Sequence, residues 1–338
     1  MVVLGIETSC DETSAALVAD GRRGLVDIVA SQADLHARWG GVVPEVASRM
    51  HVERVLPVVQ EAMEKAKITS AEIDGIAVTN RPGLIGALVV GVAAAKALAL
   101  AWNRPLVGVH HLIGHIYACY LAEPRLVPPF VCLIVSGGHT ELIYVDRTGE
   151  CTVLGRTRDD AAGECLDKCA RMLDLPYPGG AHLERLAEQG DPQRVPLPRA
   201  WLEGSADFSF SGLKTAVARY LRQNTHEIRR EDVAAALQGA VVDVLVEKTV
   251  AAARSVGVEA IGIGGGVAAN RTLSRAMADA ALAVGIRCIT PLPPLCTDNA
   301  SMIAAAGYDR LIRGEDDGLG LDAAASAPLP RASSVEGT

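Results

Sequence analysis

Two histidines at helical spacing are the clearest chemical signal in this sequence of 338 residues. His111 and His115 lie four positions apart in HHLIGH, inside a run that is otherwise typical of an apolar helix. Positions i and i+4 share one face of a helix, so both imidazoles can reach one metal ion. Two ordinary histidines on a buried helix are the alternative. A zinc peptidase helix has the pattern H-E-x-x-H, and Leu112 occupies the position of its general base, which disfavours proteolysis.

A metal site needs further ligands, and Asp298 in the stretch LCTDNASMIAAAG is a candidate. Two histidines and a carboxylate with open positions suit Zn²⁺ or Fe²⁺ acting as an electrophile that grips substrate oxygens. Spacing alone does not bring Asp298 near the histidines. Thr297 or Asp298 can equally serve as the N-cap of the helix that follows.

Each half of the chain opens with a strand, a short polar turn and a second strand, at residues 2–20 and 130–146. Backbone N–H groups in such turns can contact phosphate, and two facing turns can hold a nucleotide, although plain hairpins are the alternative. Strands and helices then alternate in each half, with strands expected near DGIAVT, PLVGV and EAIGIGG. Long helices are expected near 44–65, 85–101, 230–254 and 267–283.

This repetition predicts a duplicated α/β fold. We expect an N-terminal lobe at 1–125 and a C-terminal lobe at 126–312, whose last helix can pack back on the first lobe. Residues 313–338 lose all periodicity and are expected to form a loose tail.

Further candidates for ligand contact lie in the second half. In AIGIGGGVAANRTL an apolar strand runs through glycines into a helix, which lets a ligand approach the backbone; the segment is neither a dinucleotide motif nor a P-loop. Asn270, in the first turn of that helix, can contact a ribose or base, or can simply cap the helix. Asp167 can accept a ligand hydroxyl or lie on a solvated face. The turn PYPGG, ending at Gly180, can bring backbone close to a ligand.

The composition bounds the setting of this chemistry. The net charge of −8 argues against a generic nucleic-acid coat protein, but not against an enzyme that meets RNA locally. Eight scattered cysteines without a CxxC pair fit a reducing cytosol. The apolar run at 84–102 contains Lys96 and is better explained as a buried helix than as a membrane span. We therefore expect a cytoplasmic protein that does not use a membrane.

Several segments together resemble the TsaD family, the bacterial tRNA threonylcarbamoyladenosine transferases once labelled O-sialoglycoprotein endopeptidases. In chain order they are LGIETSCDETS, GGVVPEVASRMH, HHLIGH, LIVSGGHTEL, DDAAGECLDK, LPYPGG, DFSFSGLKTAV, GGGVAANRTL and LCTDNASMIA. The resemblance implies a two-lobed fold of the actin, hexokinase and Hsp70 type (ASKHA), with a nucleotide cleft between the lobes. It implies transfer of a threonylcarbamoyl group from threonylcarbamoyl-adenylate to N6 of adenosine 37 in tRNAs that read codons beginning with A, releasing AMP.

The resemblance also implies roles for individual residues and for partners. His111, His115 and Asp298 match the family's ligands for iron or zinc. The positions that match its substrate-binding residues are Ile134, Val135, Ser136, Gly137, Gly138, Asp167, Gly180 and Asn270. Asp11 and Glu12 match a segment linked to activity. The implied partners are tRNA, a TsaB-type paralogue and a TsaE-type ATPase.

Two positions depart from the family pattern. Arg81 replaces the first glycine of the usual GPGL, which puts the local turn in question, and Ile113 stands where many members have glutamate inside the histidine motif. Three rival functions remain open. They are a small-molecule O-carbamoyltransferase of the same fold, a sugar or acetate kinase of that fold, and a noncatalytic ATP-binding scaffold.

Overall fold

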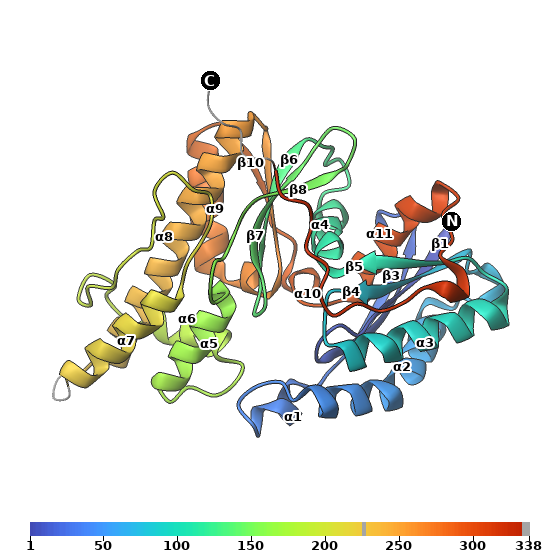
Figure 1. Ribbon diagram of the computed structural model, residues 1–338, viewed down its shortest axis with the longest axis horizontal. Coiled ribbons are helices and arrows are strands. Elements are labelled where there is room, and N and C mark those ends of the chain that lie inside the picture. Colours follow the sequence, from blue (N-terminus) through green and yellow to red (C-terminus); the bar gives the residue numbers. More distant parts are fainter. Residues whose placement is uncertain (225–227, 333–338) are drawn as a thin grey trace. The chain divides into compact units, whose positions relative to one another are not determined.

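The computed structural model describes residues 1–224 and 228–332, and the chain divides into two compact units (Figure 1). The first unit contains Met1–Leu126 and Pro291–Pro328; the second contains Val127–Thr290 and the described residues from Leu329 onward. Residues 291–312 were expected in the second lobe, with its last helix able to pack back on the first, and in this division they belong to the first unit.

The first unit is built on a five-stranded sheet with the strand order β3-β2-β1-β4-β5. Its strands are β1 (Val2–Glu7), β2 (Glu12–Ala19), β3 (Arg23–Ser31), β4 (Gly75–Arg81) and β5 (Leu106–His110). The first three form an antiparallel meander, and β4 and β5 run parallel to β1. Antiparallel neighbours need only short turns, whereas the parallel strands are joined through helices.

Helices cover both faces of this sheet. Side chains alternate along a strand, so β1 contributes Leu4 and Ile6 to a core with α2 (Pro44–Ala66) and α3 (Ile85–Trp102). Val3 points to the other core, formed with α4 (His111–Ala122) and α11 (Ala300–Ile312). At Gly5 an added Cβ would lie 2.2 Å from the carbonyl oxygen of Ala300. Glycine there lets α11 approach the sheet closely.

The second unit repeats the topology with the strand order β10-β9-β6-β7-β8. Its strands are β6 (Phe130–Val135), β7 (Thr140–Val145), β8 (Cys151–Arg156), β9 (Ala260–Gly264) and β10 (Arg287–Ile289). Again three strands form an antiparallel meander, and two further strands run parallel to the meander's first strand. The duplicated α/β plan predicted from the sequence is confirmed.

The remaining elements are shorter or belong to the second unit. Helices of the second unit are α5 (Ala162–Met172), α6 (Gly179–Ala187), α7 (Ser211–Gln223), α8 (Arg230–Val256) and α9 (Arg271–Ala283), with the 3-10 turn η2 (Gly266–Ala269). The first unit adds α1 (Ala33–Ala37), α10 (Pro293–Cys296), η1 (Ser70–Glu72) and η3 (Gly318–Gly320). The four long helices expected from periodicity correspond to α2, α3, α8 and α9.

The predicted loose tail is wrong for residues 313–332. Asp317 accepts the Gly108 N–H at 2.7 Å and pairs with Arg310 at 2.9 Å. Farther along, the backbone oxygens of Asp322 and Ala327 accept hydrogen bonds from side chains at the ends of β4 and β5. Lack of periodicity hid these contacts, because hydrogen bonds to strand ends need no repeating pattern. Residues 333–338 lie outside the described residues.

Among the described residues, α3 is long and apolar enough to cross a membrane. A third of its most apolar window, 33%, is buried inside the unit, and its inner residues, such as Leu88 and Val92, pack against the sheet. The same length and composition are found in core helices of water-soluble proteins. None of the eight cysteines, all of which lie in the described residues, forms a disulfide bond.

Candidate functional site

The helix α4 positions the two histidines directly after a strand. His110 ends β5 and caps α4: its Nδ1 accepts the Leu112 N–H at 3.2 Å, and its Nε2 donates to the Ala327 carbonyl at 2.6 Å. The next turn carries His111 and His115 on one face, with ring centroids 4.7 Å apart. Both rings are buried, and His115 is 0% exposed. The predicted spacing is thus realised on a helix whose start is held by the C-terminal segment.

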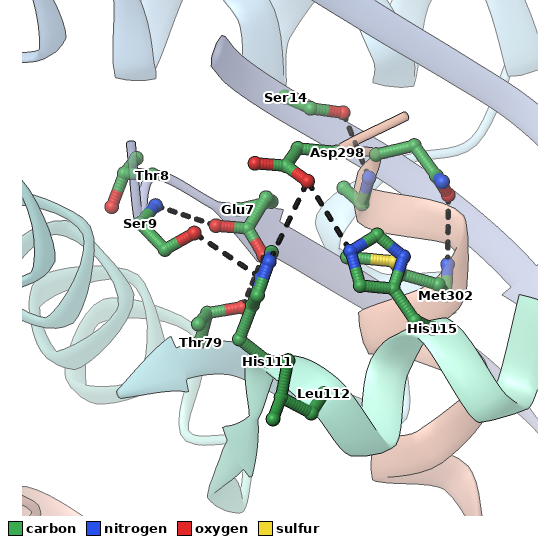
Figure 2. A network of polar contacts seen from close by, with 12 residues as sticks. Glu7, Thr8, Ser9, Ser14, Thr79, His111, Leu112, His115, Asp298 and Met302 are labelled. Carbon is green, nitrogen blue, oxygen red and sulfur yellow. Dashed lines mark hydrogen bonds and ion pairs between the residues drawn. The ribbon is translucent and has the colours of Figure 1, made fainter. Parts of the chain in front are cut away.

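Asp298 reaches the histidines from the turn before α11 (Figure 2). Its Oδ1 lies 3.5 Å from His111 Nε2 and 3.4 Å from His115 Nε2. The N-cap of α11 is Asn299, whose side chain accepts the Met302 N–H at 3.0 Å. The alternative prediction that Thr297 or Asp298 caps this helix is therefore wrong, and Asp298 is directed to the histidines instead.

The three side chains form one candidate metal centre. Each offers a ligand atom, and these atoms lie within 4.8 Å of one another. Two imidazoles and a carboxylate are the donor types of zinc and non-haem iron sites. Neither ring nitrogen of buried His115 has a hydrogen-bond partner of ordinary geometry among the described residues. Buried polar atoms are normally satisfied, so an ion is a fitting partner for this ring. The cluster can hold a metal ion.

The electrostatics of the site also suit a cation. Burial acts to lower the pKa of His111, but the charges of Asp298 and Glu7 and a hydrogen bond with Glu7 raise that pKa to about 9. Burial lowers the pKa of His115, against the influence of Asp298. The site therefore attracts positive charge at His111, where the ring borders two carboxylates.

Sequence reasoning missed a polar network behind His111. Glu7 Oε2 lies 3.0 Å from His111 Nδ1 and accepts the Thr79 hydroxyl at 2.7 Å. The Ser9 hydroxyl lies 3.2 Å from the same His111 nitrogen. The sequence did contain one signal for this network: the strand VVLGIE is apolar except for its last residue, Glu7. A glutamate that is fully buried at the end of such a strand needs hydrogen-bond partners.

Asp11 lies in the turn between β1 and β2, and Glu12 is the first residue of β2. Burial, together with the charges of Asp11 and Asp298, raises the pKa of Glu12 to about 9. The Ser31 hydroxyl donates to Glu12 at 3.2 Å. This acidic turn is thus within electrostatic reach of Asp298; its role in activity stays a prediction.

The second unit carries the glycine turn. Ile134 and Val135 end β6 with fully buried side chains, so only their backbone could meet a ligand. Ser136 shapes the turn, because its hydroxyl oxygen accepts the N–H groups of Gly138 at 3.3 Å and of His139 at 3.1 Å. A Cβ added at Gly137 or Gly138 would meet no heavy atom within 4 Å. The backbone of the turn is open on that side.

Other glycines bring neighbouring segments to the same end of β6. A Cβ at Gly163, in the first turn of α5, would lie 2.6 Å from the Ser136 carbonyl oxygen. At Gly265, where φ is +91°, it would lie 2.4 Å from the Val135 carbonyl oxygen. Both contacts require glycine. The open turn, the start of α5 and the end of β9 therefore meet at one edge of the second sheet.

The remaining candidates have structural partners. Asp167 accepts the N–H groups of Gly179 at 2.8 Å and of Gly180 at 3.2 Å, so the structure brings Asp167 and Gly180 together. Asn270 is the N-cap of α9, one position before the expected first turn, and accepts the Leu273 N–H at 2.9 Å. Its amide also donates to Gln238 at 2.9 Å. Contact of these residues with substrate stays a prediction.

The two departures from the family pattern have simple positions. Arg81 ends β4 next to an irregularity in its pairing with β5, and its guanidinium donates to Asn80 at 3.2 Å. Asn80 in turn contacts the C-terminal segment through the Asp322 carbonyl. Ile113 packs against the core between the sheet and α11. Neither change alters the ligand set.

Comparison with solved structures supports the fold. HypF from T. kodakarensis matches with a TM-score of 0.63 at 15% identity, covering 95% of this chain and 49% of that one. Component A of (R)-2-hydroxyglutaryl-CoA dehydratase from Acidaminococcus fermentans matches with a TM-score of 0.56 at 16% identity, covering 92% of this chain and 99% of that one. These neighbours confirm the predicted α/β fold of the ASKHA type.

Comparison of sequences is more specific. A tRNA N6-adenosine threonylcarbamoyltransferase from Symbiobacterium thermophilum is 57% identical over 309 residues, covering 91% of each chain. The corresponding protein of Bacillus subtilis is 54% identical over 325 residues, covering 94% of this chain and 93% of the relative. The family model described as TsaD, tRNA N6-adenosine threonylcarbamoyltransferase, matches residues 24–305. The chain belongs to the TsaD family.

Proposed function

We propose that this protein transfers the threonylcarbamoyl group from threonylcarbamoyl-adenylate to N6 of adenosine 37 in tRNAs that read codons beginning with A. The new bond joins N6 to the carbamoyl carbon, the bond from that carbon to the phosphate oxygen breaks, N6 gives up one proton, and AMP leaves. The observation that carries the proposal is the His111, His115 and Asp298 cluster, in a chain that matches the TsaD family model over residues 24–305. A small-molecule O-carbamoyltransferase is not favoured, because both relatives described above are named tRNA N6-adenosine threonylcarbamoyltransferase.

The chemistry explains why such a site suffices. An exocyclic adenine amine is a poor nucleophile, so the carbamoyl group arrives activated as a mixed anhydride. The protein's work is then orientation and stabilisation of the oxyanion and the departing phosphate. The base must also leave its stack to reach the reacting carbon.

The two units would divide this work. In the first unit, His111, His115 and Asp298 would hold one Fe²⁺ or Zn²⁺ ion, which supplies a Lewis acid for substrate oxygens. In the second unit, the glycine turn of Ser136, Gly137 and Gly138 would bind the adenylate phosphate with the Gly137 N–H as donor, since the N–H groups of Ser136 and Gly138 already donate within the turn. Asp167, Gly180 and Asn270 would fix the nucleoside, and the backbone of Ile134 and Val135 would line its path. Asp11 and Glu12 would act beside the metal centre as acid and base groups.

We further propose that the enzyme works in the cytoplasm, where its tRNA substrate is found, and acts with a TsaB-type paralogue and a TsaE-type ATPase. The adenylate would come from a separate enzyme that joins the N-carboxylated form of threonine to the AMP group of ATP. The share of the relatives that the chain covers, above 90%, leaves no large domain of those proteins unmatched.

The test is transfer of labelled threonine to an unmodified tRNA. The chain, its TsaB-type and TsaE-type partners and threonylcarbamoyl-adenylate are combined with and without chelator, and adenosine 37 is examined by nucleoside mass spectrometry. A tRNA with guanosine at position 37 is the control. Product that disappears with chelator supports the proposal. Labelling of a small alcohol or amine instead of tRNA would support the rival carbamoyltransferase.

A further inference from the structure

A buried glutamate lies directly behind one of the metal-ligand histidines (Figure 2). Glu7 is the last residue of β1 and is 0% exposed. Its Oε1 accepts the Ser9 N–H at 2.5 Å; its Oε2 accepts the Thr79 hydroxyl at 2.7 Å and lies 3.0 Å from His111 Nδ1. Removing a carboxylate from water is costly unless hydrogen bonds and opposite charge compensate. The contact with His111 indicates what this buried carboxylate does.

The contact with Glu7 sets the state of the His111 ring. Both oxygens of Glu7 already accept hydrogen bonds, from the Ser9 N–H and the Thr79 hydroxyl, so in the contact with Glu7 it is Nδ1 of His111 that carries the hydrogen and donates it. In a neutral ring the lone pair is then on Nε2, which is the atom that faces Asp298 at 3.5 Å. The Ser9 hydroxyl, 3.2 Å from Nδ1, can rotate its hydrogen to suit either partner. Glu7 thus presents the ligand atom on the side of the metal centre.

The network also fixes where the ring can lie. Thr79 is on β4, Ser9 follows β1 and His111 begins α4, so one carboxylate joins three segments around the histidine. His115 has no comparable support, since its Nδ1, the nitrogen that does not face Asp298, has no hydrogen-bond partner among the described residues. The two ligand histidines are therefore held in different ways, and only His111 has a carboxylate on its far side.

We infer that Glu7 is a positioning residue for the metal centre: through its contact with Nδ1 it holds His111 with Nε2 toward the ion and makes that ligand a stronger donor. The inference rests on the proposed function, in which His111 is a metal ligand. Carboxylates behind ligand histidines commonly raise metal affinity by roughly 10- to 100-fold.

The first test is zinc affinity of the full chain, measured by competition with a chromophoric chelator. Glu7→Gln keeps the shape of the side chain and removes its charge, and should weaken zinc binding by roughly 10- to 100-fold while circular dichroism stays unchanged. Thr79→Val is the matched control, because it removes one donor to Glu7 and leaves the carboxylate beside His111; its loss should be much smaller. Equal affinity of Glu7→Gln and the unchanged chain would overturn the inference.

A second measurement needs no variant at Glu7, in case that variant does not fold. Long-range ¹H–¹⁵N spectra of the zinc-loaded chain, assigned with His111→Gln, should show the hydrogen on Nδ1 of His111 and the metal on Nε2. The reverse arrangement would contradict a positioning role for Glu7. A chain that folds but binds no zinc would remove the metal from the proposed function and this inference with it, whereas unchanged affinity in Glu7→Gln would remove the inference alone.

Discussion

The ends of β1 and β6 occupy the same place in two copies of one topology, yet they are built for different chemistry. After β1 the chain continues with Thr8 and Ser9, which are buried, and Glu7 contacts His111, a candidate metal ligand. After β6 it continues with Ser136, Gly137 and Gly138, and the two glycines border open space. One end places buried side chains around a candidate metal site, and the other end exposes backbone.

This difference shows how a duplicated fold can supply two kinds of binding from one scaffold. Side-chain ligands need a packed environment that fixes their orientation, which the core beneath β1 and α11 provides. Backbone donors are fixed by the turn itself and need only the absence of side chains. Substitutions at the two ends should therefore fail in different ways.

The largest effect is expected from loss of a side-chain ligand. Asp298→Ala removes the carboxylate that both histidines face and should lower tRNA threonylcarbamoylation by about 100-fold or more, since a catalytic metal contributes several kcal/mol. Measured metal content should fall as well. The neighbouring Asn299→Ala removes the cap of α11, so it should cost about 1 kcal/mol of stability and leave metal bound. Wild-type turnover by Asp298→Ala would exclude a role for the cluster in transfer.

Substitutions at and beside the glycine turn should separate an effect on folding stability from an effect on substrate binding. Gly163→Ala places a methyl group against the Ser136 carbonyl and should cost about 1–3 kcal/mol in urea unfolding. Gly137→Ala meets no protein atom and should leave unfolding unchanged, while raising the KM for the adenylate by about tenfold, because the methyl group covers the open backbone. Unchanged KM in Gly137→Ala would show that the substrate does not use this face.

A smaller effect on stability is expected from the C-terminal segment. Asp317→Ala leaves the Gly108 N–H without its acceptor and removes one of the two carboxylates that pair with Arg310, the other being Glu315, so it should cost about 1–3 kcal/mol in urea unfolding. Asp322→Ala is the matched control, because that side chain is exposed and bonds only the next residue's N–H. Its change should stay within about 0.5 kcal/mol. Equal stability of the two variants would contradict a structural role for this segment.

The smallest effect concerns acid stability of the second unit. Burial alone would raise the pKa of Asp207, but hydrogen bonds from the Arg156 N–H, Arg331 and Arg158 outweigh it and lower that pKa to about 2. A lowered pKa means that Asp207 stabilises the fold above its ordinary pKa, and that this contribution is lost as pH falls from about 4 to 2. Asp207→Asn should therefore be less stable by about 1–2 kcal/mol at pH 7. In denaturant titrations the difference should shrink below pH 4; a constant difference would contradict this assignment.

The sequence predicted those features that depend on residues close together in the chain, and missed contacts between residues far apart in it. Periodicity and glycine positions located the long helices and the repeated strand pairs, because these patterns are local. The i, i+4 spacing placed His111 and His115 on one face for the same reason. Only the family resemblance predicted that Asp298 lies near the histidines, because no spacing in the sequence relates it to His111. Glu7 was missed because its partner is 104 positions away.

The prediction of a loose C-terminal tail was wrong for a related reason. Its backbone oxygens accept hydrogen bonds from side chains more than 200 positions earlier, at His110 and Asn80. Composition there resembles that of a disordered segment, with small and polar residues. The contacts that hold it are scattered along the segment, among them those of buried Leu321 and of the acceptor Asp317. Isolated contacts of this kind leave no pattern in a single sequence.

The most direct test of the central claim is to add metal back to the metal-free chain and follow transfer to tRNA. The chain is stripped with chelator, returned to assay with its partners, and titrated anaerobically with Fe²⁺ and separately with Zn²⁺. We expect threonylcarbamoylation to rise in proportion to bound metal and to stop rising at one ion per chain, and we expect no rise in His115→Ala. Full activity of the metal-free chain would contradict the account, because the His111, His115 and Asp298 cluster would then have no part in the reaction.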